Sequence, residues 1–174
     1  MSGRLTLYVG PMGAGKSTLL CSVAKAEGAA LYTSAVDSRT PEGIRLHTGE
    51  VIGARKIAAA GDIVCPPGVQ KVCIDEAQFI PLEGLVSVTG HLLARGVSVG
   101  MAGLDLDSER RPFAFVEAMR ALGAEVLQMT ARCDECGESA AFTRCNVPKD
   151  GFLVDTGGNF YNPVCDLHWR PGPQ

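Results

Sequence analysis

The glycine-rich stretch at residues 10–17, which reads GPMGAGKS, constrains this chain more than any other feature. It matches the pattern G-x-x-x-x-G-K-[ST], which is typical of a phosphate-binding loop. The apolar run Leu5–Val9 precedes it and predicts a buried strand, and Lys16–Glu27 follows it and predicts a helix. In that setting, backbone N–H groups and the helix N-terminus face a phosphate. The plainer alternative is a glycine-rich turn with a chance lysine, and the flanking strand and helix argue against it.

Within this loop, Lys16 is expected to reach the outer phosphates of a nucleotide, and the Ser17 hydroxyl is expected to ligate Mg²⁺. The residues expected to contact the nucleotide form the phosphate loop: Gly10, Pro11, Met12, Gly13, Ala14, Gly15, Lys16, Ser17 and Thr18.

Apolar strand patterns alternate with amphipathic helical patterns up to about residue 130. Further strands are predicted at residues 29–35, 69–75, 97–103 and 126–130, and further helices at residues 82–95 and 113–122. Nearly continuous apolar strands separated by helices predict an α/β fold, with a parallel sheet covered on both faces. Residues 38–62 are less regular and predict a mobile connection with a short helix near residues 52–60.

Composition narrows the classes of function. The net charge of −3 gives no general signal for nucleic acid or for an anionic membrane. No apolar run has membrane-spanning length, and the N-terminus lacks a signal-peptide pattern, so we expect a cytoplasmic location. Seven cysteines in such a chain favour metal binding or core packing over disulfides.

A second element of the phosphate site is the apolar run that ends in Asp75 and Glu76. A strand of this kind lies beside the phosphate loop in related architectures, and its terminal aspartate holds Mg²⁺. Glu76 is then placed to accept a proton from the attacking hydroxyl. The alternative interpretation of Asp75 and Glu76 is a solvated acidic pair at the end of a strand. The phosphate loop upstream favours the functional interpretation.

The composition changes after residue 130, and we predict two domains: a nucleotide-binding α/β domain at 1–130 and a small zinc-binding lobe at 131–174. The pairs Cys133/Cys136 and Cys165/His168 have the spacing of tetrahedral Zn²⁺ ligands, although 28 residues separate them. Free thiols and a surface histidine are the alternative, and Cys145 is a candidate substitute ligand. The other cysteines, and the histidines His47 and His91, are expected to be structural.

These motifs together resemble the thymidine kinase family of the cytosolic, zinc-containing type, and the resemblance covers nearly the whole chain. The segments that carry it are GPM-x-x-GKST, DE-x-QF at residues 75–79, Gly103-Leu104-Asp105, Arg111-Pro112-Phe113, Asp37-Ser38-Arg39, the Cys₃His set, and Gly157-Gly158 with Tyr161. None of these segments is specific alone, whereas the set is.

The resemblance implies transfer of the γ-phosphoryl group of ATP to the 5′-hydroxyl of thymidine. Glu76 would be the base, and Lys16, Arg39 and Mg²⁺ would neutralise the transferring group, with Ser17 and Asp75 as the magnesium ligands. It implies a structural zinc on Cys133, Cys136, Cys165 and His168, and a homo-oligomer, a tetramer in the family. The residues it places at the nucleoside are Met12, Asp37, Gln78, Leu104, Ser108, Phe113, Thr143, Gly158 and Tyr161.

The chain departs from the family pattern on the nucleoside side. Ser108 stands where an aromatic ring is usual, and Gly13 stands where an aromatic residue is common. The resemblance assigns Gly157-Gly158 and Tyr161 to the family's lasso, a loop that closes over the base, and here the lasso is one residue shorter between Gly158 and Tyr161. Losing a stacking ring would weaken thymidine binding or make room for a bulkier base. The rival interpretations are the same reaction on another or 5-modified deoxynucleoside, a P-loop ATPase or switch with a zinc partner-binding lobe, and a silent nucleotide-binding protein.

Overall fold

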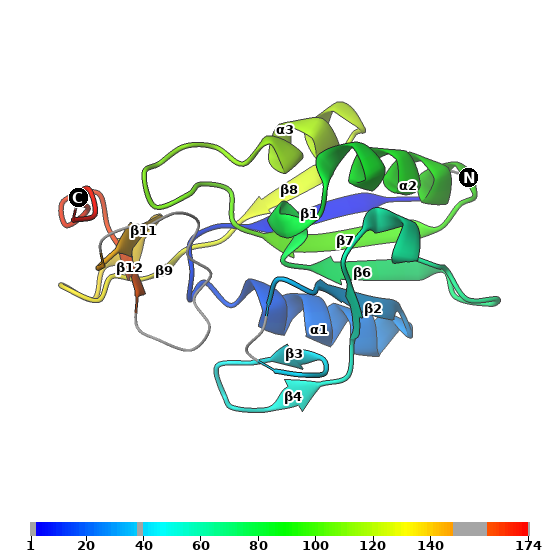
Figure 1. Cartoon of the computed structure of the whole chain (residues 1–174), viewed down its shortest axis with the longest axis horizontal. Helices are drawn as coiled ribbons and strands as arrows, with labels where there is room; N and C mark the ends of the chain where they lie inside the picture. The colour runs from blue at the N-terminus through cyan, green and yellow to red at the C-terminus, as the bar shows by residue number, and fades with distance from the viewer. Residues whose placement is uncertain (1–2, 38–39, 148–159, 174) are drawn as a thin grey trace.

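The computed structural model describes residues 3–37, 40–147 and 160–173. Its centre is a six-stranded, wholly parallel sheet in the order β5-β2-β6-β7-β1-β8 (Figure 1). The strands are β1 (Leu5–Val9), β2 (Ala30–Ser34), β5 (Arg55–Ile57), β6 (Lys71–Asp75), β7 (Ser98–Gly103) and β8 (Glu125–Gln128).

Helices cover both faces of the sheet, as the sequence predicted. The helix α1 (Lys16–Glu27) lies on one face, and α2 (Leu82–Ala94) and α3 (Ala114–Ala121) lie on the other (Figure 1). Two 3₁₀ turns, η1 (Ala60–Asp62) and η2 (Ala77–Phe79), complete the set.

Side chains of the central strands alternate between two apolar layers. In β6, Val72 and Ile74 belong to the main core, whereas Cys73 packs in the cluster that contains Leu20 of α1. All three strand residues are inaccessible to solvent. A strand buried on both faces in this way reads as a continuous apolar run, which is why the sequence revealed it.

The predicted helix near residues 52–60 is wrong. This region instead forms an antiparallel hairpin, β3 (Ile44–Arg45) with β4 (Val51–Ile52), and then β5, which pairs in parallel with β2 at the edge of the sheet. Pairing with β2 satisfies the backbone of β5 and buries Ile57 in the main core. Such short strands are formed by tertiary contacts and leave little periodic pattern.

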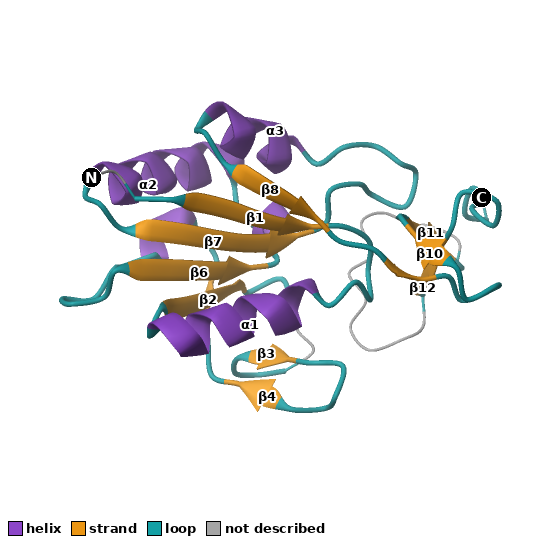
Figure 2. Cartoon of the chain, turned by 180° about the vertical axis from the view of Figure 1, so that it is seen from behind, coloured by secondary structure: helices purple, strands orange, loops and turns teal. Residues whose placement is uncertain are grey.

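The C-terminal lobe, residues 131–147 and 160–173 of the described chain, lies beyond the carboxyl ends of the sheet strands (Figure 2). It contains two antiparallel pairs, β9 (Ala131–Arg132) with β10 (Ser139–Ala140) and β11 (Phe142–Cys145) with β12 (Tyr161–Val164). A small core around Cys133, Ala140 and Val164 holds it together. The division into two domains stays a prediction.

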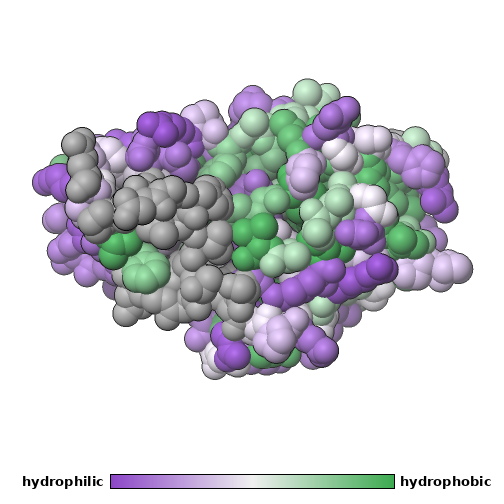
Figure 3. All heavy atoms as spheres, viewed as in Figure 1, coloured by the Kyte–Doolittle hydropathy of each residue, from purple (hydrophilic) through white to green (hydrophobic). Residues whose placement is uncertain are grey.

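Within the ranges described, no helix has the length and apolar character needed to cross a bilayer. In the space-filling view, hydrophobic residues gather near the middle of the visible face, and hydrophilic residues occupy much of the periphery (Figure 3).

Candidate active site and metal centre

The phosphate loop joins β1 to α1 and follows the carboxyl end of a central strand. Gly15 caps α1 with φ 79°, a left-handed conformation that glycine adopts without steric cost. The helix therefore begins at Lys16 with its first N–H groups directed toward the loop. This is the strand–loop–helix arrangement that the motif requires.

Side-chain contacts help to hold the loop in shape. The Lys16 ammonium donates to the Pro11 carbonyl oxygen over 2.6 Å, so its side chain folds over the loop. The Met12 N–H donates to Thr143 Oγ1 of β11 over 3.1 Å, and Thr143 is buried. The second contact joins the phosphate loop directly to the C-terminal lobe.

Ser17, in the first turn of α1, meets Asp75 at the end of β6, although β1 and β6 are not neighbours in the sheet. The order of the sheet places β7 between β1 and β6, yet Ser17 Oγ donates to Asp75 Oδ1 over 3.0 Å. The contact forms because α1 packs across β7 and β6. Asp75 is buried at the end of β6, so the two predicted magnesium ligands present adjacent oxygen atoms.

Glu76 is held in an unusual backbone conformation directly after β6. Its φ of 52° is left-handed, which costs a non-glycine residue about 1–3 kcal/mol. Its Oε2 accepts a hydrogen bond from Gln78 Nε2 over 2.7 Å, and Gln78 Oε1 accepts one from the Leu104 N–H over 3.2 Å. Gln78 therefore fixes the carboxylate of Glu76 relative to the end of β7.

Gly103 makes this bridge sterically feasible. A Cβ atom at that position would lie 2.5 Å from Gln78 Oε1 and 2.9 Å from the Phe115 ring. The glycine at the end of β7 therefore permits the close approach of the amide that orients Glu76.

The other residues predicted at the nucleoside come from separate elements. Asp37 is buried just after β2, Phe113 caps α3 and packs against the main core, and Tyr161 opens β12 opposite Cys145. Ser108 is buried in the connection between β7 and α3. Arg39 and Gly158 lie outside the described residues.

The four predicted zinc ligands gather at one point of the C-terminal lobe. Their ligand atoms all lie within 4.8 Å of one another. Cys165 Sγ and Cys133 Sγ are 3.1 and 3.8 Å from His168 Nδ1, and Cys136 Sγ is 3.8 Å from Cys165 Sγ. A tetrahedron with Zn–S bonds of about 2.3 Å has edges of about 3.8 Å, so the set fits zinc. Cys145 is not part of the cluster.

The environment of Cys133 favours the thiolate that a metal needs. Burial acts to raise the pKa of Cys133, but backbone N–H groups of Cys165, Cys136 and Glu135 donate to its sulfur and lower the pKa to about 6. Thiolates, not thiols, ligate zinc.

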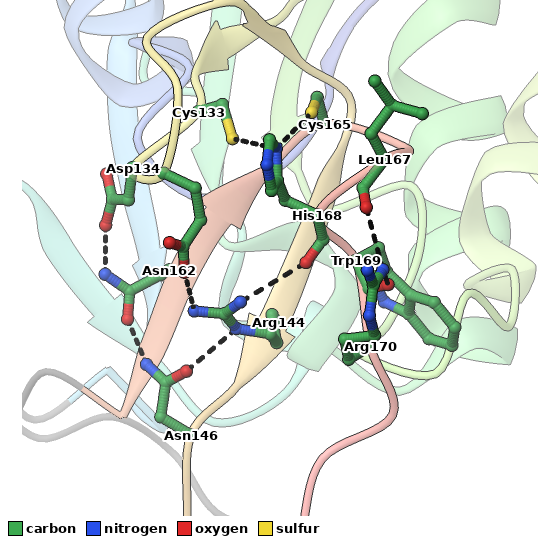
Figure 4. A network of polar contacts seen from close by, with 11 residues as sticks. Cys133, Asp134, Arg144, Asn146, Asn162, Cys165, Leu167, His168, Trp169 and Arg170 are labelled. Atoms are coloured by element: carbon green, nitrogen blue, oxygen red, sulfur yellow. Dashed lines mark hydrogen bonds and ion pairs between the residues drawn. The ribbon is translucent and has the colours of Figure 1, made fainter.

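A polar network connects the two turns that carry the predicted zinc ligands, residues 133–136 and residues 165–168 (Figure 4). Arg144 donates to Glu135 Oε1 over 2.8 Å and to the His168 carbonyl oxygen over 3.3 Å. The hydrogen bond from Arg144 and its positive charge lower the pKa of Glu135. Asn162 of β12 donates to Asp134, the neighbour of Cys133, and so connects β12 to the 133–136 turn. Such supporting contacts orient metal ligands.

Sequence reasoning missed several of these supports. Arg144 carries no motif, and Lys56 of β5 donates to the carbonyl oxygens of Asp37 and Thr40 without any sequence signal. Both act through chain segments that meet only in the folded protein.

Three comparisons place the chain among known proteins. The family model described as thymidine kinase matches residues 3–169. The thymidine kinase of Pseudothermotoga lettingae is 32% identical over 95% of this chain and 94% of its own length. The thymidine kinase of Myxoma virus is 30% identical over 94% of each chain. A solved structure titled ATPase aligns with a TM-score of 0.47 and 16% identity over 94% of this chain and 79% of its own, which is too slight to argue from.

The family match spans both the phosphate loop and the cysteine–histidine cluster. The two relatives align with this chain over nearly their whole length. The chain therefore belongs to the thymidine kinase family and is a nucleoside kinase.

Proposed function

We propose that this protein transfers the γ-phosphoryl group of ATP to the 5′-hydroxyl of thymidine and so forms thymidine monophosphate. The observation that carries the proposal is the position of Glu76, directly after Asp75 and oriented by Gln78. An oriented carboxylate next to the phosphate loop suits a base that removes the hydroxyl proton during transfer.

The phosphate side supplies charge neutralisation. The backbone of the phosphate loop and Lys16 would hold the β- and γ-phosphates. Lys16 would exchange its contact with the Pro11 carbonyl for phosphate oxygens. Arg39 would approach the transferring group from the connection after β2.

Ser17 and Asp75 would hold Mg²⁺, and their adjacent oxygens are the hard donors that this ion prefers. Bound Mg²⁺ would offset negative charge on the phosphates. Zn²⁺ would occupy the cluster of Cys133, Cys136, Cys165 and His168 and would have a structural role, because four protein ligands leave no open position.

The nucleoside would lie between the carboxyl ends of the strands and the C-terminal lobe, near Met12, Leu104 and Thr143. Support for this position comes from the contact between Met12 and Thr143 and from the link between Gln78 and Leu104. Because Ser108 and Gly13 depart from the family pattern, a second candidate acceptor is a 5-modified or otherwise different deoxynucleoside. We further propose a homo-oligomer, a tetramer by family resemblance, that works in the cytoplasm on small-molecule substrates.

The test compares ATP consumption with thymidine, with 5′-deoxythymidine and with no nucleoside. A kinase consumes ATP only when the acceptor hydroxyl is present, so only thymidine should stimulate turnover. A P-loop ATPase, in which Glu76 would activate water, consumes ATP equally in all three reactions. Equal rates would therefore contradict the proposal.

A further inference from the structure

The 104–113 segment, which connects β7 to α3, is shaped by its own side chains. Asp107 Oδ1 accepts hydrogen bonds from the N–H groups of Glu109 and Arg111 over 2.8 and 2.9 Å. Leu106 pairs with Pro112 across the base of this turn. At its tip, Arg110 adopts φ 63°, a left-handed conformation that is unfavourable for arginine.

The Arg110 side chain reaches into the C-terminal lobe. Its guanidinium carbon lies 3.8 Å from the centroid of the Phe142 ring and 4.2 Å from that of the Trp169 ring. Both distances are well inside the range of cation–π attraction. Its NH2 atom also forms an ion pair with Asp166 Oδ1 at 2.7 Å.

Each of these partners is linked to the metal centre or to the phosphate loop. Asp166 lies between the ligands Cys165 and His168, and Trp169 follows His168. Phe142 precedes Thr143, which accepts the Met12 N–H. Arg110 therefore contacts the ligand-bearing turn and the strand that touches the phosphate loop.

A second contact joins the same parts. Trp169 Nε1 donates to the Ser108 carbonyl oxygen over 3.2 Å. Trp169 thus holds the segment by a hydrogen bond at Ser108 and by ring stacking at Arg110. Among the described residues, the buried Nε atom of Arg110 has no hydrogen-bond partner, so ring contacts and the Asp166 ion pair hold this side chain.

We propose that Arg110 is a positioning residue that couples the metal centre to the nucleoside side of the active site. Through Trp169 and Asp166, the ordered ligand turn fixes the 104–113 segment, and with it Leu104 at the start of that segment. Bound zinc then contributes to nucleoside affinity as well as to the fold of the lobe. This inference rests on the proposed function for its kinetic consequence, but not for the coupling itself.

The test uses Arg110→Gly, because glycine adopts the left-handed conformation freely and removes only the side chain. Arg110→Lys keeps the charge without the planar group that stacks on rings. Arg120→Ala, on the exposed side of α3, is the matched control. Trp169 is the sole tryptophan of the chain, so intrinsic fluorescence reports its contacts alone.

We expect Arg110→Gly to retain about one zinc per chain and to bind ATP within about twofold of wild type, because neither site is altered. Its Trp169 emission should shift to the red, amide exchange in residues 104–113 should accelerate, and the KM for thymidine should rise about tenfold. Arg110→Lys should recover part of the affinity, and Arg120→Ala should match wild type. A chelator added to the wild type should reproduce the red shift.

An unchanged emission spectrum and an unchanged thymidine KM in Arg110→Gly would overturn the proposal. Loss of zinc from that variant would also overturn it, because Arg110 would then be part of the metal centre. If the wild-type protein phosphorylates no nucleoside, the proposed function fails, whereas the fluorescence, zinc content and amide exchange still decide the coupling.

Discussion

The Ser17 hydroxyl donates a hydrogen bond to Asp75 Oδ1 over 3.0 Å, which joins the phosphate loop after β1 to the end of β6, a strand that is not adjacent to β1 in the sheet. Glu76 follows at once, in a left-handed backbone conformation, and faces Gln78. In the proposed reaction, these consecutive residues would have two roles: the Asp75 carboxylate would bind the metal ion and the Glu76 carboxylate would face the acceptor hydroxyl.

Replacing Glu76 with glutamine should remove the proton acceptor and keep the shape of the side chain. We expect ATP affinity to stay near the wild-type value and phosphoryl transfer to fall by about 10²–10⁴-fold. Equilibrium ATP binding and single-turnover transfer measure the two quantities. Glu83→Gln, at an exposed position in the first turn of α2, is the matched control. Near wild-type transfer in Glu76→Gln would remove Glu76 from the role of base.

Replacing Gln78 with leucine should misorient Glu76, because the amide bridges that carboxylate and the Leu104 N–H. Loss of a hydrogen bond to a charged group predicts a decrease of about tenfold in kcat. The ATP dissociation constant should hardly change, since the proposed function assigns Gln78 to the acceptor side and not to the phosphate side. Steady-state kinetics with varied ATP and varied nucleoside separate these effects, and a variant with normal kcat would show that Glu76 is oriented by other groups.

Replacing Cys133 with serine should release zinc and lower the thermal midpoint by about 5 °C or more, because metal binding stabilises the folded lobe. Cys145→Ser is the informative control, since Cys145 is buried in the same lobe, on β11, but lies outside the ligand cluster. That control should keep its zinc. Elemental analysis and thermal unfolding check both variants, and stoichiometric zinc in Cys133→Ser would contradict the assigned ligand set.

Thiol reactivity should divide the cysteines by environment. Burial raises the pKa of Cys21 to about 12 and that of Cys73 to about 11. At pH 8 about one Cys73 side chain in a thousand, and fewer at Cys21, would be the reactive thiolate. With zinc bound, a thiol reagent should therefore label only Cys65 readily, since Cys145 is also buried.

A chelator should add the three ligand cysteines, Cys133, Cys136 and Cys165, to the labelled set. Mass spectrometry of labelled peptides makes the measurement, and Cys65→Ser should remove the zinc-independent label. Rapid labelling of Cys73 in the zinc-loaded protein would show that the core is less closed than we describe.

The parts of the fold that follow from sequence are those built by local chemistry. The phosphate loop, the strand that ends at Asp75 and the two ligand pairs each carry their pattern within a few residues. The strand β5 carries none, because it exists only through its pairing with β2 at the sheet edge. The contacts of Arg110 with Trp169 and of Gln78 with Leu104 join segments that are distant in the sequence, so no local sequence pattern predicts them.

The departure from the family pattern at Ser108 has a different meaning in the folded chain than in the sequence. From sequence, Ser108 is a position that lacks a ring. In the structure it is buried, and its carbonyl oxygen accepts a hydrogen bond from Trp169, an aromatic residue supplied by the C-terminal lobe. No pattern in the sequence connects these two positions.

In the proposed reaction, a nucleoside hydroxyl accepts the phosphoryl group. The most direct measurement follows labelled γ-phosphate from ATP into a panel of deoxynucleosides, with 5-modified pyrimidines included and a reaction without nucleoside as the control. We expect label in thymidine monophosphate and almost no labelled phosphate released without an acceptor. Preference for another deoxynucleoside would retain the kinase reaction and change the assigned acceptor, whereas phosphate release that does not depend on an acceptor would overturn the proposed reaction.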